Sequence, residues 1–325
     1  MSVLVTGATG HVGINVVRRF REAGHEVVGL DYRAIDRSLA QTFGCGADFV
    51  QGDVTDFDKL LDLVRSRHVE GIVHTAAMLG AACSRDLVRA TRINVIGTQH
   101  VLEIARQVGV RRIISVSSGS VFQRWPDPKR IIEEGEPPSP ISLYGTTKRM
   151  GELLVDCYHS SFHLSVCSVR MSWVYGPPLY ATGFEADRGP IPYWLYQILN
   201  GQSVCEPSGG DFMANFTYVD DVAEGLLRLY HVDLLRYSLY QLSTGEHYTV
   251  NDIVRSIQAL IPEAKLTIGP GTGAYAGLTP MRGSFSIKRL QEDTGFVPQF
   301  PIDKGIAKYV DWLRGEIQRR GGNPA

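Results

Sequence analysis

The sequence lacks any hydrophobic run that could cross a membrane, and it lacks any cluster of basic residues. No apolar stretch approaches the roughly 18 residues that a membrane-spanning helix needs. The formal net charge is only −1, and no stripe of lysine and arginine marks a nucleic-acid surface. We therefore expect a protein whose partners are neither membranes nor nucleic acids.

Cysteine is scarce as well. The 325 residues contain five cysteines, an odd number, and no C-x-x-C pair. This usage argues against a disulfide framework and against a cysteine-rich zinc site, so no metal is expected. The first apolar run begins at Ser2, which leaves no room for a signal peptide. These features predict a cytoplasmic protein in a reducing compartment.

Three glycines follow the first apolar run at a spacing of three residues, and a plausible helix follows them. Gly7 can take the turn from strand to helix, Gly10 lets phosphates approach the backbone, and Gly13 lets the helix pack closely on the strand. The helix N-terminus adds free N–H groups and a positive dipole end. This context predicts a dinucleotide site. Its predicted residues in this turn are Gly7, Thr9, Gly10, His11, Val12 and Gly13.

Strand-like and helix-like segments alternate through the first half of the chain. The strand patterns are Val3–Thr6, Val27–Asp31, Phe49–Gln51, Gly71–His74, Arg112–Ser117 and Leu164–Arg170, and the helix patterns are Val12–Ala23, Asp56–Arg67, Leu87–Val108 and Leu143–Tyr158. This alternation predicts an α/β fold with a doubly wound parallel sheet of the Rossmann type. After Arg170 the rhythm breaks, and irregular Gly- and Pro-rich chain predicts a smaller C-terminal α/β cap that closes a substrate cleft.

The acid at the end of the second strand pattern bears on the choice of cofactor. Asp31 lies 18 residues beyond Gly13, where a carboxylate accepts hydrogen bonds from the adenosine ribose and repels a 2′-phosphate. We therefore predict NAD. Arg33 and Arg37 leave NADP open as the alternative, because either could bind a 2′-phosphate.

Residues after the third and fourth strand patterns extend the predicted cofactor site. Asp53 could accept from the adenine amino group while Val54 packs on the ring, although a turn aspartate is the alternative for Asp53. Small side chains at Ala76 and Ala77 let a cofactor lie against the backbone. His74 is more typical of a core histidine with hydrogen-bond partners than of a catalyst.

A serine, a tyrosine and a lysine suit the oxidation of an alcohol to a ketone. Tyr144 and Lys148 are four residues apart, so both project from one face of a helix, and Ser117 and Ser118 close the fifth strand pattern. Hydride leaves the carbon for nicotinamide while a base removes the hydroxyl proton. Lowering a tyrosine pKa from about 10 towards 7 needs roughly 4 kcal/mol. A lysine ammonium and a cationic nicotinamide could supply it, while a serine orients the substrate oxygen.

These motifs, in this order and along nearly the whole chain, resemble the NAD-dependent epimerase/dehydratase family of the extended short-chain dehydrogenase/reductase superfamily. Besides Asp31, the matches are T-G-A-T-G-H-V-G at Thr6–Gly13, G-D-V at Gly52–Val54, H-T-A-A at His74–Ala77, N-V-I-G-T at Asn94–Thr98, S-S-G-S-V-F at Ser117–Phe122, P-I-S-L-Y-G-T-T-K at Pro140–Lys148, R-x-x-x-V-Y-G-P at Arg170–Pro177, Y-V-D-D-V-A at Tyr218–Ala223 and T-G-F-V-P at Thr294–Pro298. The resemblance implies that Ser118, Tyr144 and Lys148 are catalytic. It also implies that Asn94 belongs to the cofactor site.

The resemblance also implies a domain division and an assembly. An NAD-binding domain would span residues 1–170, with 218–243 returning to it, and a substrate-binding cap would span 171–217 and 244–325. The helix patterns near Leu87–Val108 and Leu143–Tyr158 would pair two copies through a four-helix bundle, which makes a homodimer.

Three departures from the family bear on the substrate. Dehydratases carry an acid just after the position of Ser118, where this chain has Gly119 and Ser120. Nucleotide-sugar epimerases usually have Asn in place of Trp173, and they have Arg, which binds the diphosphate, in place of Ala214. The predicted substrate-binding residues are Met78, Ser120, Trp173 and Arg282.

We therefore predict an NAD-dependent dehydrogenase that acts on a secondary hydroxyl of a small sugar, sugar acid or hydroxy acid. The alternative is a nucleotide-sugar (UDP-sugar) 4-epimerase, in which NADH forms transiently and returns its hydride. A non-catalytic NAD-sensing module is a third reading, against which the intact Ser118, Tyr144 and Lys148 argue.

Overall fold

The computed structural model describes residues 2–36, 40–41, 43, 46–124, 127–179, 189–273, 281 and 283–321. Its centre is a seven-stranded sheet in which every pairing is parallel. In spatial order the strands are β11 (Leu239–Leu242), β6 (Val166–Met171), β5 (Arg112–Val116), β4 (Val69–His74), β1 (Ser2–Thr6), β2 (Glu26–Asp31) and β3 (Asp48–Gln51). The chain starts in the middle and winds outward in both directions, which confirms the predicted doubly wound sheet.

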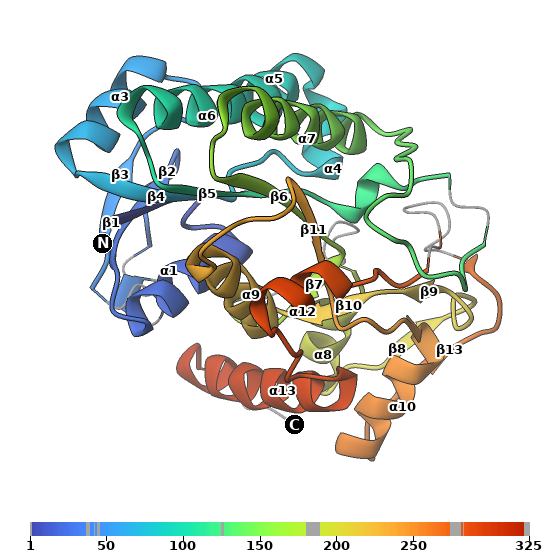
Figure 1. The fold of residues 1–325 in the computed structure, drawn as a ribbon. Coiled ribbons are helices and arrows are strands. Elements are labelled where there is room, and N and C mark those ends of the chain that lie inside the picture. Colours follow the sequence, from blue (N-terminus) through green and yellow to red (C-terminus); the bar gives the residue numbers. More distant parts are fainter. Residues whose placement is uncertain are drawn as a thin grey trace.

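Helices cover both faces of the sheet (Figure 1). One layer holds α3 (Phe57–Ser66), α4 (Gly80–Arg85), α5 (Leu87–Thr91), α6 (Gly97–Val108) and α7 (Leu143–Phe162), and the other holds α1 (His11–Glu22), α9 (Val219–His231) and α12 (Lys288–Thr294). Because both faces are covered, the central strands are apolar and buried throughout, as in Val3, Leu4 and Val5 of β1.

The long helix pattern Leu87–Val108 contains one irregularity that the sequence does not reveal. A π-helical turn, Arg92–Ile96, lies between α5 and α6, so the helical stretch is continuous but locally widened. Such turns insert an extra residue and rotate the side chains that follow, and they are frequent at functional sites. Asn94 lies at the centre of this turn.

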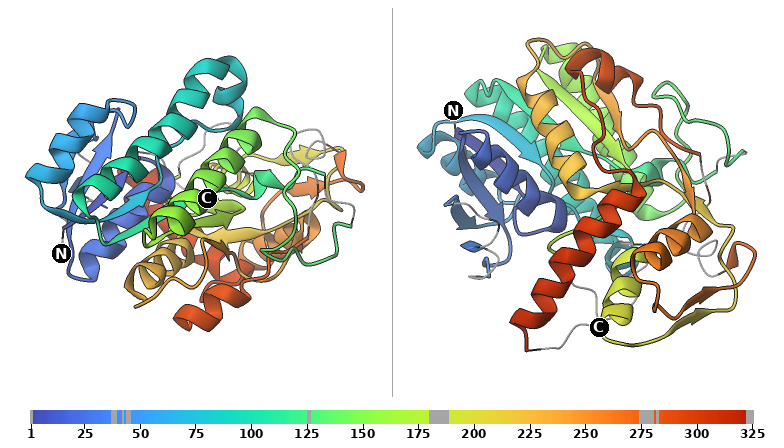
Figure 2. Two further views of the ribbon diagram at one scale, coloured as in Figure 1. Left: turned by 45° about the horizontal axis from the view of Figure 1, so that its top comes forward. Right: turned by 90° about the horizontal axis from the view of Figure 1, so that it is seen from below.

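The rest of the chain packs around a second apolar core, which includes Trp194 and Tyr309. Its elements are β7 (Trp173–Tyr175), α8 (Ile191–Leu199), β8 (Val204–Glu206), β9 (Met213–Ala214), β10 (Phe216–Tyr218), β12 (Tyr248–Thr249), α10 (Val250–Leu260), β13 (Leu266–Ile268) and α13 (Ile302–Arg319). The strands form three two-stranded sheets. Figure 2 shows α13 beside α8 and α10, which it contacts.

The packing of the elements agrees with the predicted domain boundaries in one segment and differs from them in another. β11 pairs with β6 and α9 packs on α1, so this segment lies with the first half of the chain. However, α12 also packs against α9 and β11, although the predicted limits assign it to the cap. The division into two domains stays a prediction.

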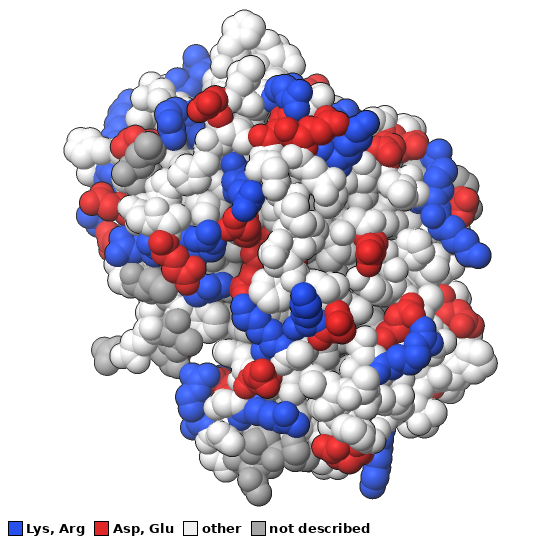
Figure 3. All heavy atoms as spheres, turned by 60° about the horizontal axis from the view of Figure 1, so that its bottom comes forward, with Lys and Arg blue, Asp and Glu red and all other residues white. Residues whose placement is uncertain are grey.

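Two surface properties bear on partners. No helix among the described residues is long and apolar enough to cross a membrane. On the face shown in Figure 3, acidic side chains are interspersed among the basic ones, so that face presents no basic stripe.

Candidate active site

The glycine-rich turn brings β1 and α1 close together. Gly7 has a φ of +69°, and a Cβ built there would lie 2.7 Å from the backbone nitrogen of Ala76. A Cβ built on Gly13 would lie under 3.0 Å from the carbonyl oxygen of Gly7. Both positions therefore exclude larger residues, Gly7 by its left-handed backbone and Gly13 by the approach of the helix.

The N-terminus of α1 offers an anion site. Gly10 precedes the helix and makes no side-chain cap, and the first turn contains no acidic residue. The first N–H groups of a helix have no partner within the helix, and they carry the positive end of its dipole. The turn from Gly7 to Gly13 can therefore hold a pyrophosphate in the way its sequence predicts.

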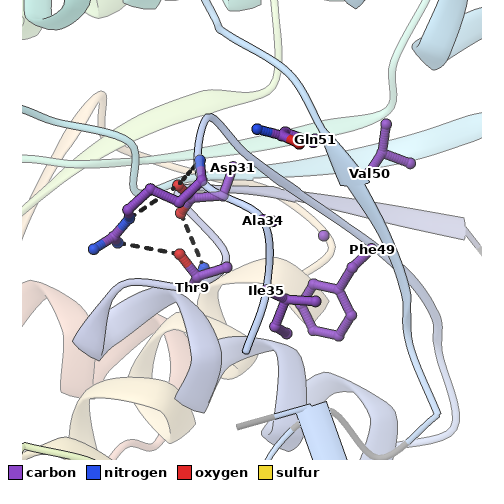
Figure 4. A pocket seen from close by; sticks show the side chains of 9 residues that line it. Thr9, Asp31, Ala34, Ile35, Phe49, Val50 and Gln51 are labelled. Carbon is purple, nitrogen blue, oxygen red and sulfur yellow. Dashed lines mark hydrogen bonds and ion pairs between the residues drawn. The ribbon is translucent and has the colours of Figure 1, made fainter. Parts of the chain in front are cut away.

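Asp31 lies at the carboxyl end of β2, where its carboxylate is fixed from two sides. Oδ2 accepts from the backbone N–H of Thr9 at 3.0 Å, and Oδ1 accepts from that of Arg33 at 3.1 Å. The guanidinium of Arg33 folds back, with Nε 3.5 Å from Oδ1 and Nη2 donating to Thr9 Oγ1 at 3.1 Å. These residues line a hollow of about 190 Å³, where Figure 4 places Phe49 and Gln51 as well. Arg37 lies outside the described residues.

A second hollow, of about 390 Å³, lies between the turn after β3 and α5. It is lined by Asp53, Thr55, Asp86, Val88, Arg89, Arg92 and Ile93. Asp53 Oδ1 accepts from both the backbone N–H and the hydroxyl of Thr55 at 2.9 Å. This oxygen therefore stabilises the turn, as in the alternative role given above for Asp53. Val54 is buried against Gly97. The adenine contacts of Asp53 and Val54 stay predictions, and sequence reasoning missed the α5 side of this hollow.

His74, at the end of β4, is a core histidine, as predicted. Its Nδ1 lies 2.7 Å from Thr6 Oγ1 and its Nε2 lies 3.1 Å from Thr98 Oγ1, so both ring nitrogens have partners. Burial and, to a smaller extent, the nearby Lys148 ammonium together lower the pKa of His74 to about 3. The ring is therefore neutral at physiological pH and is not an acid or base for the reaction.

The side chain of Asn94 hydrogen-bonds two other segments of the protein. Its Oδ1 accepts from the backbone N–H of Met78 at 2.7 Å, and its Nδ2 donates to Met78 O and to Thr147 Oγ1, both at 3.0 Å. These bonds tie the loop that carries Ala77 and Met78 to α7. A direct contact of Asn94 with the cofactor, and of Met78 with substrate, stays a prediction.

The predicted catalytic residues come from two elements that touch. Ser118 caps the 3-10 turn Gly119–Val121, with its Oγ accepting from Ser120 N–H at 3.1 Å. α7 begins at Leu143, and a Cβ at Gly145 would lie under 3.0 Å from the carbonyl oxygen of Ser120. The end of α7 that carries Tyr144 therefore packs directly on the turn that follows Ser118.

Lys148 follows Tyr144 by one turn of α7 and is only 7% exposed. Burial lowers the pKa of Lys148 and the charges of Glu152 and Cys83 partly offset this, so that the pKa is about 8. The ammonium is therefore charged at neutral pH and close to the end of the helix that carries the tyrosine. Sequence reasoning missed Glu152, although its spacing of four residues after Lys148 places it on the same face.

Comparison with known proteins identifies the family. Residues 3–234 match the model of the NAD dependent epimerase/dehydratase family. The chain belongs to this family. It is therefore an NAD-dependent enzyme.

Full-length relatives carry several names. UDP-glucose 4-epimerase of Mycolicibacterium smegmatis is 29% identical, over 98% of this chain and 100% of that protein. The crystal structure of Thermus thermophilus UDP-glucose 4-epimerase in complex with NAD has a TM-score of 0.83 at 26% identity, covering 97% and 99% of the two chains. The structure of L-threonine dehydrogenase from Clostridium difficile has a TM-score of 0.84 at 20% identity, covering 97% and 98%, which is a likeness of fold alone.

The predicted substrate residues of this epimerase/dehydratase chain that the structure describes lie in three different segments: Met78 after β4, Ser120 in the 3-10 turn and Trp173 in β7. Trp173 packs in the cap, with ring centroids 5.8 Å from Phe212 and 5.2 Å from Phe216. Ser120 is half-buried in the turn beside α7. Arg282 lies outside the described residues. The substrate roles of these residues stay predictions.

Replacing Gly13 by alanine is expected to raise the Kd for NAD at least about tenfold, because it would move the N-terminus of α1 away from the pyrophosphate. The new Cβ would meet the Gly7 carbonyl and push α1 from the turn. Isothermal titration calorimetry with NAD measures the change. Gly315→Ala is the control, because its Cβ would enter open space in α13. Wild-type affinity in Gly13→Ala would contradict the assignment of this turn to the pyrophosphate.

Proposed function

We propose that this chain oxidises a secondary hydroxyl of a small polar substrate, such as a sugar, sugar acid or hydroxy acid, with Tyr144 as the base. The observation that carries the proposal is the contact between the Tyr144 end of α7 and the turn that Ser118 caps, with the buried Lys148 ammonium one turn away. NAD, when bound, supplies the hydride acceptor. Its pyrophosphate would lie at the Gly7–Gly13 turn and its adenosine ribose at Asp31.

In this proposal each side chain has one task. The Tyr144 phenolate takes the proton of the substrate hydroxyl as hydride leaves the same carbon. The Lys148 ammonium favours the phenolate as an opposite charge, in surroundings where burial reduces the screening by water. The Ser118 hydroxyl hydrogen-bonds the reacting oxygen and fixes its direction.

The cap supports a small substrate rather than a nucleotide sugar. Ala214, where nucleotide-sugar epimerases of the family have the diphosphate-binding arginine, is 6% exposed and belongs to the cap core. The neighbouring Asn215 side chain is used within the protein, since it donates to Glu246 O at 3.2 Å and accepts from Phe285 N–H at 3.2 Å. Loss of such a charge-assisted clamp would weaken diphosphate binding by about 1.5–3 kcal/mol.

A UDP-sugar 4-epimerase is the second candidate, and one observation favours it. The full-length relatives with this name match nearly the whole chain, including its cap. An epimerase would share the first half-reaction and then return the hydride to the opposite face of the ketone. The residues assigned above to the reaction would serve both outcomes.

NADH absorbance separates the two candidates. Pure enzyme is mixed with excess NAD and a panel of free sugars, sugar acids, hydroxy acids and UDP-sugars, and the products are analysed by NMR. We expect sustained NADH formation with one free small molecule. Conversion of a UDP-sugar to its 4-epimer, with no more than one equivalent of NADH per subunit, would establish the epimerase instead.

We also propose that two copies pair through the α5–α6 and α7 layer. The exposed large apolar side chains on these helices and on the π turn are Leu87, Val88, Ile96, Met150, Leu153 and Phe162. Large apolar side chains exposed on one layer of helices are typical of an interface, and a two-fold pairing would bury them on both copies.

Light scattering is expected to give twice the chain mass of 35.9 kDa. Leu153→Asp, at a side chain 52% exposed on α7, should shift the mass to that of the monomer, because it buries a charge in the interface. Leu234→Asp is the matched control, since Leu234 is 72% exposed and follows α9 on the other face of the sheet. A monomer mass for the wild type would contradict the pairing.

A further inference from the structure

Three polar residues form a row along the buried face of α7. Tyr144, Lys148 and Glu152 are each four residues apart, which sets them on one face at steps of about 6 Å along the axis. Lys148 is 7% and Glu152 is 4% exposed. Burying a charge is costly unless other groups compensate it, so the partners of this row decide what it can do.

Glu152 is held by four hydrogen bonds from three elements. Its Oε1 accepts from Ser117 Oγ and from Arg170 Nε, both at 2.7 Å. Its Oε2 accepts from Arg170 Nη2 at 2.9 Å and from Arg149 Nη1 at 3.0 Å. Burial raises the pKa of Glu152, but the hydrogen bonds and charge of Arg170 outweigh it and hold the pKa below its usual value. The carboxylate is thus ionised and fixed.

The surroundings of this row are otherwise mainly cationic or neutral. The titratable and charged groups that face Lys148 and Glu152 are His74 of β4, Cys83 of α4, Arg149 of α7 and Arg170 of β6. Glu134, in the loop after the 3-10 turn, contacts this group through its backbone carbonyl, which accepts from Arg170. Glu152 therefore supplies a negative charge one helical turn from the Lys148 ammonium. Without it, that ammonium would share a buried region with the Arg170 guanidinium.

We propose that Glu152 is a positioning residue of the hydride-transfer site, which keeps the Lys148 ammonium charged beside Tyr144 and fixes, through Ser117, the turn that carries Ser118. The first effect is electrostatic, because a unit charge one turn away favours the protonated lysine. The second is geometric, because Ser117 and Ser118 are adjacent and the Ser117 hydroxyl is tied to α7. The catalytic meaning of both effects rests on the proposed function of Tyr144 and Ser118.

The titration of Lys148 tests the electrostatic effect without a substrate. The chain has only seven lysines, so their ¹³Cε signals can be followed by NMR, and the signal missing from Lys148→Met assigns the residue. In the wild type we expect a midpoint near pH 8. Glu152→Gln keeps the shape but removes the charge, and it should lower the midpoint by about one to two pH units. Glu152→Asp keeps the charge and should restore most of the shift.

Two further variants keep this test decisive. Glu103→Gln, on α6, removes another ion-paired carboxylate and should leave the Lys148 midpoint unchanged. If Glu152→Gln alone does not fold, Glu152→Gln with Arg170→Gln removes the buried pair as a unit. The double variant should still lower the midpoint, since Glu152 is the member one turn from Lys148. An unchanged midpoint in the folded variant would overturn the proposal.

Activity supplies the link to the reaction. The alkaline limb of the plot of kcat/KM against pH should shift to lower pH in Glu152→Gln, together with the NMR midpoint. A merely structural role would lower the rate without shifting the limb along the pH axis. The two failures are distinguishable. Turnover that survives Tyr144→Phe would refute the proposed function, while an unmoved Lys148 midpoint would refute the role of Glu152 alone.

Discussion

Tyr144→Phe is expected to lower kcat by about 10²- to 10⁴-fold while the Kd for NAD stays near the wild-type value. The substitution removes only the hydroxyl that would take the substrate proton. The ring and the start of α7 remain in place, so the cofactor residues around the Gly7–Gly13 turn are unaffected. Steady-state kinetics with the substrate found in the NADH assay, together with calorimetry, separates the two quantities.

A second tyrosine on the same helix provides the control. Tyr158 lies near the other end of α7, where its hydroxyl donates to Glu103 at 3.1 Å, far along the helix from the proposed base. Tyr158→Phe should cost about 1 kcal/mol of stability through the lost hydrogen bond and leave kcat unchanged. Full turnover in Tyr144→Phe would show that another group takes the proton.

Protonation of His74 is expected to make folding strongly pH-dependent. Burial holds its folded-state pKa at about 3, against 6.5 for the free side chain. The unfolded chain therefore binds more protons between these values, so the free energy of unfolding falls as the pH drops from 6.5 and levels off below about 3. The loss accumulates at about 1.4 kcal/mol per pH unit, to about 5 kcal/mol in all.

Urea unfolding at about pH 7.5 and about pH 5 measures the accessible part, for which His74 should contribute a loss of about 2 kcal/mol. His231 adds to the loss in the same direction, because burial and then the charges of Arg111 and Arg112 lower its pKa. His74→Gln isolates the His74 part, since the amide does not titrate. If the variant lost stability with the same slope as the wild type, His74 would not be the source.

The sequence was most informative where a function depends on neighbouring residues. The glycine spacing predicted the turn because Gly7, Gly10 and Gly13 act within one strand–turn–helix unit, and the structure shows the positive φ at Gly7 and the close approach at Gly13. Tyr144 and Lys148 were readable for the same reason, since a spacing of four residues fixes a common helix face. The alternation of strands and helices predicted the doubly wound sheet through local periodicity.

Long-range contacts were not readable in this way. Asp53 was a candidate adenine acceptor, but only the folded turn shows that one of its oxygens is bound by Thr55. The resemblance implied a cofactor role for Asn94, which stays a prediction, and only the structure shows that its amide also bonds Met78 and Thr147, the latter 53 residues further along the chain. No spacing rule relates positions so far apart, because their distance depends on how whole elements pack.

By itself, then, the sequence determined the parallel sheet, the dinucleotide turn and the helix that carries Tyr144 and Lys148, since each leaves a local pattern of periodicity or spacing along the chain. Only the tertiary structure decided which groups surround these residues. Packing of α7 on β6 and on the residues that follow β5 brought Glu152 against Ser117 and Arg170, 35 and 18 residues away, and so set the charge around the lysine. Burial in a packed interior controls pKa values, and burial is a property of the whole fold.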